Sequence, residues 1–209
     1  DADRALLNAV RRNLMAHVPK MAIDSVRFQM GTYDQCVKCE QLNPAGVARR
    51  STGGTGCSKC DAPFEKEGED YVVWETNSAI PDEMIAQRMA MIPIPTDTGT
   101  YSFEEECPDC KDLVEEDRGC PTCNMIYTLR AFGSKEGSTV YAGDLVFLGD
   151  DSGSIPEKYR NIPITRLYEG QMMEFWATAK MGYGKHHAKW SPVAGVSFFP
   201  RQIGVINNV

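Results

Sequence analysis

The residues best suited to chemistry are eight cysteines, which all fall in Cys-x-x-Cys pairs: Cys36/Cys39, Cys57/Cys60, Cys107/Cys110 and Cys120/Cys123. A two-residue gap lets two thiolates converge on one metal ion, and two such pairs make a tetrahedral four-sulfur site. Disulfides are a poor explanation, because this gap gives a strained bridge and a chain with a core of this size needs no covalent staples. The spacing therefore predicts two metal sites.

The two sets of cysteines differ in the loop that joins their pairs. Cys39 and Cys57 are separated by 17 residues, which is within the range of zinc ribbons. Cys110 and Cys120 are separated by nine residues in a shorter and more acidic loop. We expect Zn2+ in both sets, with a [4Fe–4S] cluster as the alternative at Cys107, Cys110, Cys120 and Cys123, because prolines beside cysteine ligands also suit such clusters. Four thiolates leave no open coordination position, so the ions are expected to fold loops rather than to catalyse.

Other motifs for catalysis are incomplete. The stretch Gly182–Lys185 invites a phosphate-loop interpretation, but the first glycine and the final Ser or Thr of a Walker loop are missing. His186 and His187 would point apart on an extended backbone, which argues against a joint metal site. The acidic residues show no spacing that would gather paired magnesium ions. We therefore expect a protein without catalytic residues and without a direct substrate.

Composition bounds the class of protein. The chain has 209 residues, 42% of them hydrophobic, and a formal charge of −7, which allows one compact domain or two small ones. The acidic balance predicts little or no direct contact with DNA, since phosphate binding needs a clustered basic face. No apolar run approaches the ~18 residues of a membrane span, so we expect an intracellular protein that does not enter membranes. The first residue, Asp1, is not Met, which indicates a processed, trimmed or partial chain.

Periodicity predicts the elements that must position the cysteines. An apolar stripe at helical spacing predicts a helix over residues 1–18, ended by Pro19, and acidic residues in the first turn favour a second helix over 82–91. Branched and aromatic residues predict strands over 21–28, 71–75, 125–132, 140–148, 174–179 and 193–199. The coarse class is α+β.

Several widely spaced segments of the chain resemble the alpha-like subunit of multisubunit RNA polymerases. This group includes the third subunit of eukaryotic RNA polymerase II, its archaeal counterpart and, more distantly, bacterial alpha. The first matching segment is Leu7-Asn-Ala-Val-Arg-Arg12 with Val18-Pro-Lys-Met-Ala-Ile-Asp24, and the second is Glu75-Thr-Asn-Ser-Ala-Ile-Pro-Asp-Glu83 with Ile85-Ala-Gln-Arg88 and Ile92-Pro-Ile94. The third is Leu129-Arg-Ala-Phe-Gly133 with Val140-Tyr-Ala-Gly-Asp-Leu145, and the fourth is Gly182-Tyr-Gly-Lys-His-His-Ala-Lys-Trp-Ser-Pro192 with Ala194-Gly-Val-Ser-Phe198.

The resemblance implies an alpha-subunit-type dimerisation domain interrupted by an insertion domain. We expect the dimerisation domain at 1–28 and 160–209, a four-cysteine, zinc-ribbon-like insertion at 29–70, and the insertion domain with the second four-cysteine loop at 71–159. In the family, the second set of cysteines falls where eukaryotic members hold zinc and some archaeal members hold iron–sulfur clusters.

The resemblance also implies a scaffold rather than an enzyme. Family members pair with a small partner of the subunit L or eleventh-subunit type, and this heterodimer is the platform for the two largest, catalytic subunits in transcription. By this resemblance, seven residues are expected to lie at the contact with the small partner or with a large subunit. They are Asn8, Arg11, Arg12, Lys185, His187, Lys189 and Trp190. Such a subunit would work in the nucleus of a eukaryote, in the cytoplasm of an archaeon, or in the cytoplasm or virion of a virus.

The chain departs from the family pattern in three places. The insertion at 29–70 interrupts a stretch that family members run nearly straight through, and we expect a metal-folded arm that makes a lineage-specific contact through Lys38, Arg49, Arg50 and Lys59. The strands that precede the first helix in the family are absent, and so is the long C-terminal helix, so we expect either that the chain is incomplete or that a partner or a fused subunit supplies these elements.

Two other interpretations stay open at this point. One is a free-standing zinc-ribbon protein that binds nucleic acid or a regulator, although the charge of −7 speaks against nucleic acid. The other is a small redox protein that uses the second set of cysteines as an electron-transfer cluster.

Overall fold

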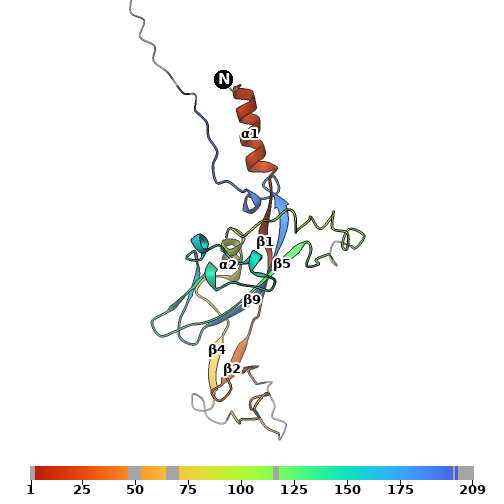
Figure 1. Ribbon diagram of the computed structural model, residues 1–209. Coiled ribbons are helices and arrows are strands. Elements are labelled where there is room, and N and C mark those ends of the chain that lie inside the picture. Colours follow the sequence, from red (N-terminus) through yellow and green to blue (C-terminus); the bar gives the residue numbers. More distant parts are fainter. Residues whose placement is uncertain (1–2, 47–52, 65–70, 115–117, 200, 202–209) are drawn as a thin grey trace, which may run out of the picture.

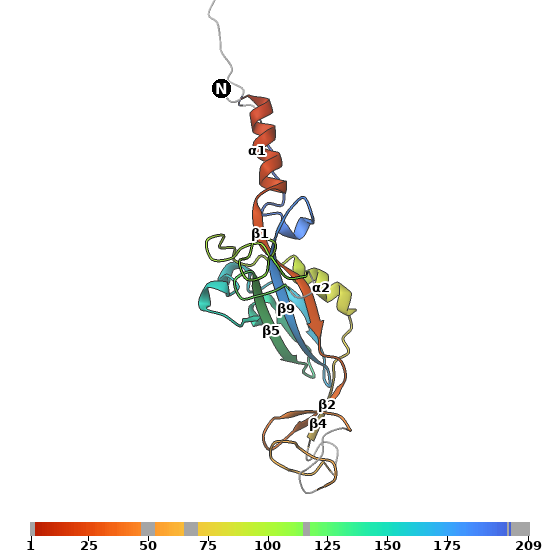
Figure 2. The same cartoon turned by 90° about the vertical axis from the view of Figure 1, so that its right-hand side faces the viewer.

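The computed structural model describes residues 3–46, 53–64, 71–114, 118–199 and 201. The molecule is elongated, with the first helix at one end, a central sheet, and a small arm that carries the first set of cysteines at the other end (Figures 1 and 2). A loop with the second set of cysteines projects from the central sheet. Arg49 and Arg50, expected to contribute to the arm's contact, lie outside the described residues.

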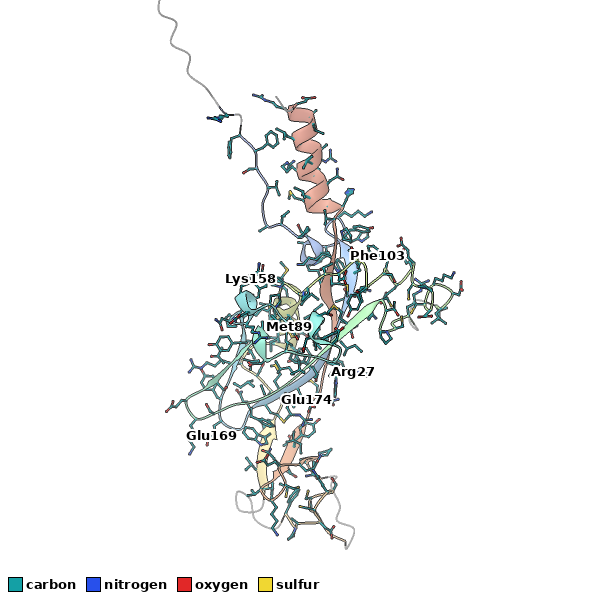
Figure 3. All side chains as sticks on the ribbon, in the orientation of Figure 1. Arg27, Met89, Phe103, Lys158, Glu169 and Glu174 are labelled. Atoms are coloured by element: carbon teal, nitrogen blue, oxygen red, sulfur yellow. The ribbon has the colours of Figure 1, made fainter. Side chains whose placement is uncertain are left out.

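The central unit is an antiparallel four-stranded sheet in the order β1-β9-β5-β7. Its strands are β1 (Pro19–Phe28), β9 (Met172–Tyr183), β5 (Asn124–Phe132) and β7 (Val146–Phe147). Side chains alternate between the two faces of a strand, and β9 accordingly buries every second residue from Met173 to Met181. These buried residues form one core with Ile85 and Met89 of helix α2 (Asp82–Ala90), which covers this face of the sheet (Figure 3).

Short elements close the other sides of the core. A two-stranded sheet pairs β6 (Ser138–Tyr141) with β8 (Pro163–Leu167), and it adds Val140, Ile164 and Leu167 to the core. Single-turn 3-10 helices lie at Ala142–Asp144, Asp151–Gly153, Glu157–Tyr159 and Ala188–Trp190. The α+β class expected from the sequence is confirmed, with strands in the majority.

The arm at the far end is a separate three-stranded sheet in the order β3-β2-β4. It consists of β2 (Thr32–Cys36), β3 (Leu42–Pro44) and β4 (Tyr71–Glu75). Trp74 of β4 packs against Phe132 at the end of β5, with ring centroids 4.8 Å apart, and the Glu75 N–H donates to the Gly170 carbonyl at 2.8 Å. The arm is therefore fastened to the central sheet at its base.

Most expected elements are present, and the differences have physical reasons. The first helix, α1, spans Arg4–Ala16. The strand expected over 140–148 is broken by the 3-10 turn at Ala142–Asp144. The prediction of a strand over 193–199 is wrong, because this segment pairs with no other strand among the described residues and hydrogen-bond pairing is what holds a strand. The expected domain boundaries stay predictions, although the four-stranded sheet takes strands from both expected domains.

Candidate metal centres and an exposed helix

The first set of cysteines converges at the tip of the arm. Cys36 ends β2, and the other three ligands lie in the turns that follow β2 and β3. The Sγ atoms of Cys36 and Cys60 are 3.5 Å apart, and so are those of Cys39 and Cys57. Four sulfurs around one zinc at 2.3 Å would lie about 3.8 Å from one another, whereas a disulfide would bring two of them to about 2.0 Å. The distances fit a metal site, and all four cysteines are free.

The two pairs in the arm form matching turns. The Glu40 N–H donates to the Cys36 carbonyl at 2.9 Å, and the Asp61 N–H donates to the Cys57 carbonyl at 3.1 Å. Glu40 and Asp61 both have positive φ, 58° and 60°, a conformation that non-glycine residues adopt only when the surroundings impose it. Each turn therefore holds its two sulfurs on the same side through its backbone.

The second set of cysteines converges in the loop before β5. The Sγ atoms of Cys107 and Cys120 are 3.4 Å apart, and those of Cys110 and Cys123 are 3.8 Å apart. Three of these cysteines are buried, and Cys120 is half-buried. The Ser102 N–H donates to the Thr122 carbonyl at 3.2 Å, so the loop is also closed by its own backbone. Both predicted ligand sets are thus brought together.

Hydrogen bonds around the sulfurs prepare one thiol in each set for ionisation. Burial would raise the pKa of Cys57, but the backbone N–H groups of Cys60 and Lys59 and the Cys39 thiol donate to its sulfur and lower the pKa to about 6. Burial opposes ionisation of Cys120 as well, and hydrogen bonds from Cys107 and Thr122 lower its pKa to about 6. Burial raises the pKa of Cys36 and of Cys123 in the same sets, so one cysteine of each set ionises more readily than its neighbours to the thiolate form that binds metal.

The chemistry open to these sites is structural. The buried cluster of the arm consists of Cys36, Cys57 and Ala62, with Cys39 and Phe64 packed against it. In the second loop, the buried cluster consists of the cysteines themselves. A metal ion held by these four cysteines would supply folding energy to a loop whose interior is otherwise its own thiols, and it would have no coordination position left for a substrate.

Helix α1 has an apolar stripe that nothing in the described chain covers. Leu6, Val10 and Leu14 are 59%, 47% and 37% exposed, and no residue of the helix is buried. Asn8 and Arg12 are exposed, and Arg11 is half-buried and donates from Nη2 to the Asn8 side-chain oxygen at 3.0 Å. The predicted interface residues of the helix thus lie on a projecting element, and their contact with a partner stays a prediction.

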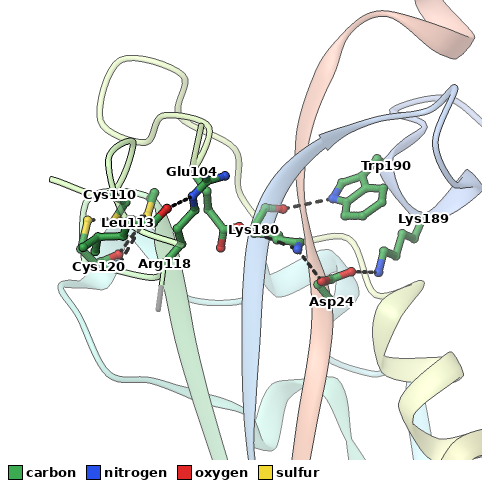
Figure 4. A network of polar contacts seen from close by, with 10 residues as sticks. Asp24, Glu104, Cys110, Leu113, Arg118, Cys120, Lys180, Lys189 and Trp190 are labelled. Carbon is green, nitrogen blue, oxygen red and sulfur yellow. Dashed lines mark hydrogen bonds and ion pairs between the residues drawn. The ribbon is translucent and has the colours of Figure 1, made fainter. Parts of the chain in front are cut away.

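The predicted interface residues near the end of β9 divide into two groups. Lys185 and His187 are exposed, as expected for a loop that meets a partner. Lys189 and Trp190 are buried within the chain: Lys189 pairs with Asp24, and the Trp190 indole donates to the Lys180 carbonyl at 3.0 Å (Figure 4). The Lys189 ammonium and the Trp190 indole N–H therefore bind groups of this same chain. Contact of these four residues with a partner stays a prediction.

Residues that the sequence did not single out hold this region together. Lys180 of β9 lies 2.9 Å from Asp24 of β1 and 3.8 Å from Glu104 of the second cysteine loop. Burial alone would raise the pKa of Asp24, but the hydrogen bonds and charges of Lys189 and Lys180 outweigh it and hold the pKa below its usual value. The signal that could have found Asp24 is its carboxylate directly after the buried apolar run Met21-Ala22-Ile23.

Among the described residues, α1 and α2 are both too short and too polar to cross a membrane.

Comparison with known proteins points to one family. The family described as the RNA polymerase Rpb3/RpoA insert domain matches residues 73–195, which is more than half of the chain. The match contains the second cysteine loop and β5 to β9, and it begins after the first cysteine set.

The curated relatives carry a consistent description. The chain is 37% identical over 126 residues to the DNA-directed RNA polymerase subunit Rpo3 of Archaeoglobus fulgidus, covering 60% of this chain and 43% of the relative. It is 30% identical over 191 residues to the same subunit of Thermococcus kodakarensis, covering 91% and 49%. With the Picrophilus torridus subunit, it shares 28% identity over 93% of this chain and 55% of the relative. The chain spans about half the length of the curated relatives it matches.

Proposed function

The chain belongs to the RNA polymerase Rpb3/RpoA insert-domain family, and from this membership we propose that it is a non-catalytic assembly subunit of a DNA-directed RNA polymerase. It would pair with a small partner of the subunit L or eleventh-subunit type, and the heterodimer would carry the two largest subunits. Its place of work would be inside the cell, wherever that polymerase transcribes. The two cysteine sites would bind zinc and hold the shape of the subunit.

One observation supports the pairing most strongly, and it is the exposed stripe of α1. Isolated helices of fewer than about 12–15 residues are marginal in water, and helices in proteins are stabilised mainly by packing an apolar face. Helix α1 has 13 residues, buries none of them, and presents Leu6, Val10 and Leu14 to solvent. A partner that covers this stripe would stabilise the helix and explain the exposed apolar side chains.

Substitution on the stripe tests the pairing. We expect L6D/V10D to abolish co-elution of the co-expressed full chain and small subunit in size-exclusion chromatography with light scattering. The matched control is M84D, because Met84 is similarly exposed, at 47%, but lies on α2. Pairing of L6D/V10D at wild-type affinity would overturn the proposal.

Metal analysis tests the assignment of zinc. We expect two zinc ions per chain in protein purified without oxygen, and C36S and C107S should each remove one. Iron and acid-labile sulfide in stoichiometric amounts would instead establish the alternative of an iron–sulfur cluster at the second set.

A further inference from the structure

The two sets of cysteines differ in how open they are to solvent. In the arm, Cys36 and Cys57 are buried and Cys39 is half-buried, whereas Cys60 is exposed. In the second loop, three cysteines are buried and Cys120 is half-buried. The structure describes all eight cysteines, and Cys60 is the only exposed one among them. A thiol reagent dissolved in water therefore meets the set in the arm first, because the reactivity of a thiol follows its access to solvent.

The turn that carries Cys60 explains its exposure. The Asp61 N–H donates to the Cys57 carbonyl at 3.1 Å, and the Cys57 N–H donates to the Ala62 carbonyl at 2.8 Å. These bonds hold Cys57 and Ala62 together in the buried cluster of the arm. The two residues between Cys57 and Cys60 are exposed. The turn thus leaves the interior of the arm after Cys57, and Cys60 lies on its outer side.

A second sulfur lies within reach of Cys60. The Sγ atom of Cys60 is 3.5 Å from that of Cys36, at the end of β2. An oxidised cysteine condenses with a neighbouring thiol to a disulfide, and this product is reversible. The pair thus combines an exposed cysteine with a buried one that can complete the reaction. Cys107 and Cys120 are similarly close, at 3.4 Å, so exposure rather than the distance between sulfurs separates the two sets.

The interior of the arm is made of the same sulfurs. Its buried cluster consists mainly of cysteines, and the core of the central sheet shares no residue with this cluster. A disulfide between Cys36 and Cys60 would take two of the four ligands from a metal ion, and the two remaining thiols do not make a closed four-sulfur site. Loss of the ion removes the folding energy that it supplies. Oxidation of this pair is therefore expected to act on the arm and to leave the central sheet intact.

We propose that the arm is a redox-sensitive element, in which a peroxide oxidises Cys60 and a disulfide between Cys60 and Cys36 then releases the metal ion. This inference rests on the metal binding proposed above and goes beyond it, because it assigns different chemistry to the two sets. The second set keeps its ion under the same conditions. The arm thus loses its shape in an oxidising environment and regains it on reduction.

The reaction needs no reagent besides one peroxide molecule. The Cys60 thiolate attacks hydrogen peroxide, so that an S–O bond forms, the O–O bond breaks and hydroxide leaves. The Cys36 thiolate then attacks the sulfur of this sulfenic acid, so that the S–S bond forms, the S–O bond breaks and a second hydroxide leaves. The two sulfurs together lose two electrons, which the peroxide takes up, and both hydroxides take protons from the solvent.

The test uses the full chain, loaded with zinc and treated with hydrogen peroxide. A colorimetric chelator follows the release of zinc, and alkylation of the remaining thiols followed by peptide mass spectrometry identifies the oxidised cysteines. We expect the disulfide between Cys36 and Cys60 to form first, and the zinc ion of the arm to leave at least about 10-fold faster than that of the second set. Hydrogen exchange should become fast over 32–36, 42–44 and 71–75 and stay slow over 124–132. Dithiothreitol with added zinc should restore the slow exchange.

Variants locate the reactive cysteine. Replacement by histidine removes the thiol and keeps a metal ligand, since histidine also binds zinc. We expect C60H to hold zinc in the arm and to release it to peroxide at least about 5-fold more slowly than the wild type. The matched variant is C120H, because Cys120 is the most accessible cysteine of the second set, and its arm should release zinc at the wild-type rate. Zinc content before treatment shows whether each site is occupied, and the mapping of oxidised cysteines in the wild type does not depend on either variant.

Three results, obtained with zinc in both sites, would overturn the proposal. They are oxidation of the second set before the arm, release of both zinc ions at the same rate, and unchanged release of zinc from the arm of C60H. Each of these results would leave the metal sites themselves standing. A wild-type chain that holds no zinc before treatment would instead overturn the metal assignment, and the redox-sensitive arm with it.

Discussion

Gly184 packs directly against the backbone of Met15: a β-carbon at position 184 would lie 2.0 Å from the Met15 carbonyl oxygen. The neighbouring Lys185 N–H donates to the Ala16 carbonyl at 3.1 Å. The turn after β9 thus holds the last turn of α1, and this contact sets how the exposed helix projects from the sheet.

We predict that G184A loosens α1. The added methyl group has to displace backbone rather than a flexible side chain, which costs about 1–3 kcal/mol in well-packed sites. Hydrogen exchange over residues 4–16 should become faster, and the thermal midpoint of unfolding should fall. The control is G195A, because nothing lies within 4 Å of a β-carbon at Gly195. If G184A and G195A behave alike, the turn does not hold the helix.

We predict that D24N destabilises the protein at neutral pH. The substitution leaves Lys189, which is buried, without its carboxylate partner. Breaking a fully buried pair costs about 3–5 kcal/mol, and we expect about 1–3 kcal/mol here because the Asp24 side chain is 27% exposed. Urea unfolding measures the loss. E169Q is the control, since Glu169 pairs with Lys135 on the surface and such pairs contribute less than about 1 kcal/mol.

The contribution of Asp24 should depend on pH. Its pKa in the folded protein lies below the ordinary value of 3.8, so the folded state favours the ionised carboxylate. The stabilisation is therefore complete above pH about 4 to 5 and is lost as the pH falls through the lowered pKa. The difference in unfolding free energy between wild type and D24N should shrink as the pH is lowered from about 6 toward about 3. A difference that grows over this range would contradict the assignment.

We predict that the two metal sites fold their loops independently. In C57S, hydrogen exchange should become fast over 32–36, 42–44 and 71–75, because the buried cluster of the arm is made mainly of its cysteines. The strands β5 and β9 belong to a different core and should stay protected. C107S is the matched variant and should expose the second loop while the arm stays protected. Global unfolding of C57S would mean that the arm is part of the central core.

The sequence was most informative where local spacing decides the structure. The four Cys-x-x-Cys pairs predicted both ligand sets, because a single turn brings together two cysteines that have two residues between them. The stripe of α1 was also predictable from its period. The strands β2 and β3 were missed, since they lie in a segment rich in charged residues and glycine where alternation is weak.

Tertiary packing determines which side chains are buried and which are neighbours, and these features could not be predicted from the sequence. Lys189 and Trp190 have the residue types of an interface, yet they are buried because Asp24 and the Lys180 carbonyl lie beside them on β1 and β9. The pairing of β1 with β9, which brings Asp24 and Lys180 together, is visible only in the folded sheet. The neighbourhood of the exposed apolar residues Ile126 and Leu148 could not be predicted for a similar reason, since the pairing of β5 with β7 brings them together from separate segments.

The measurement that tests the central claim most directly is native mass spectrometry of the complex purified through a tag on this chain. We predict one assembly in which this chain is present in a one-to-one ratio with a small alpha-like subunit and with each of the two largest subunits of a DNA-directed RNA polymerase. L6D/V10D should release the small subunit from it. A stable, well-folded monomer without polymerase subunits would contradict the account.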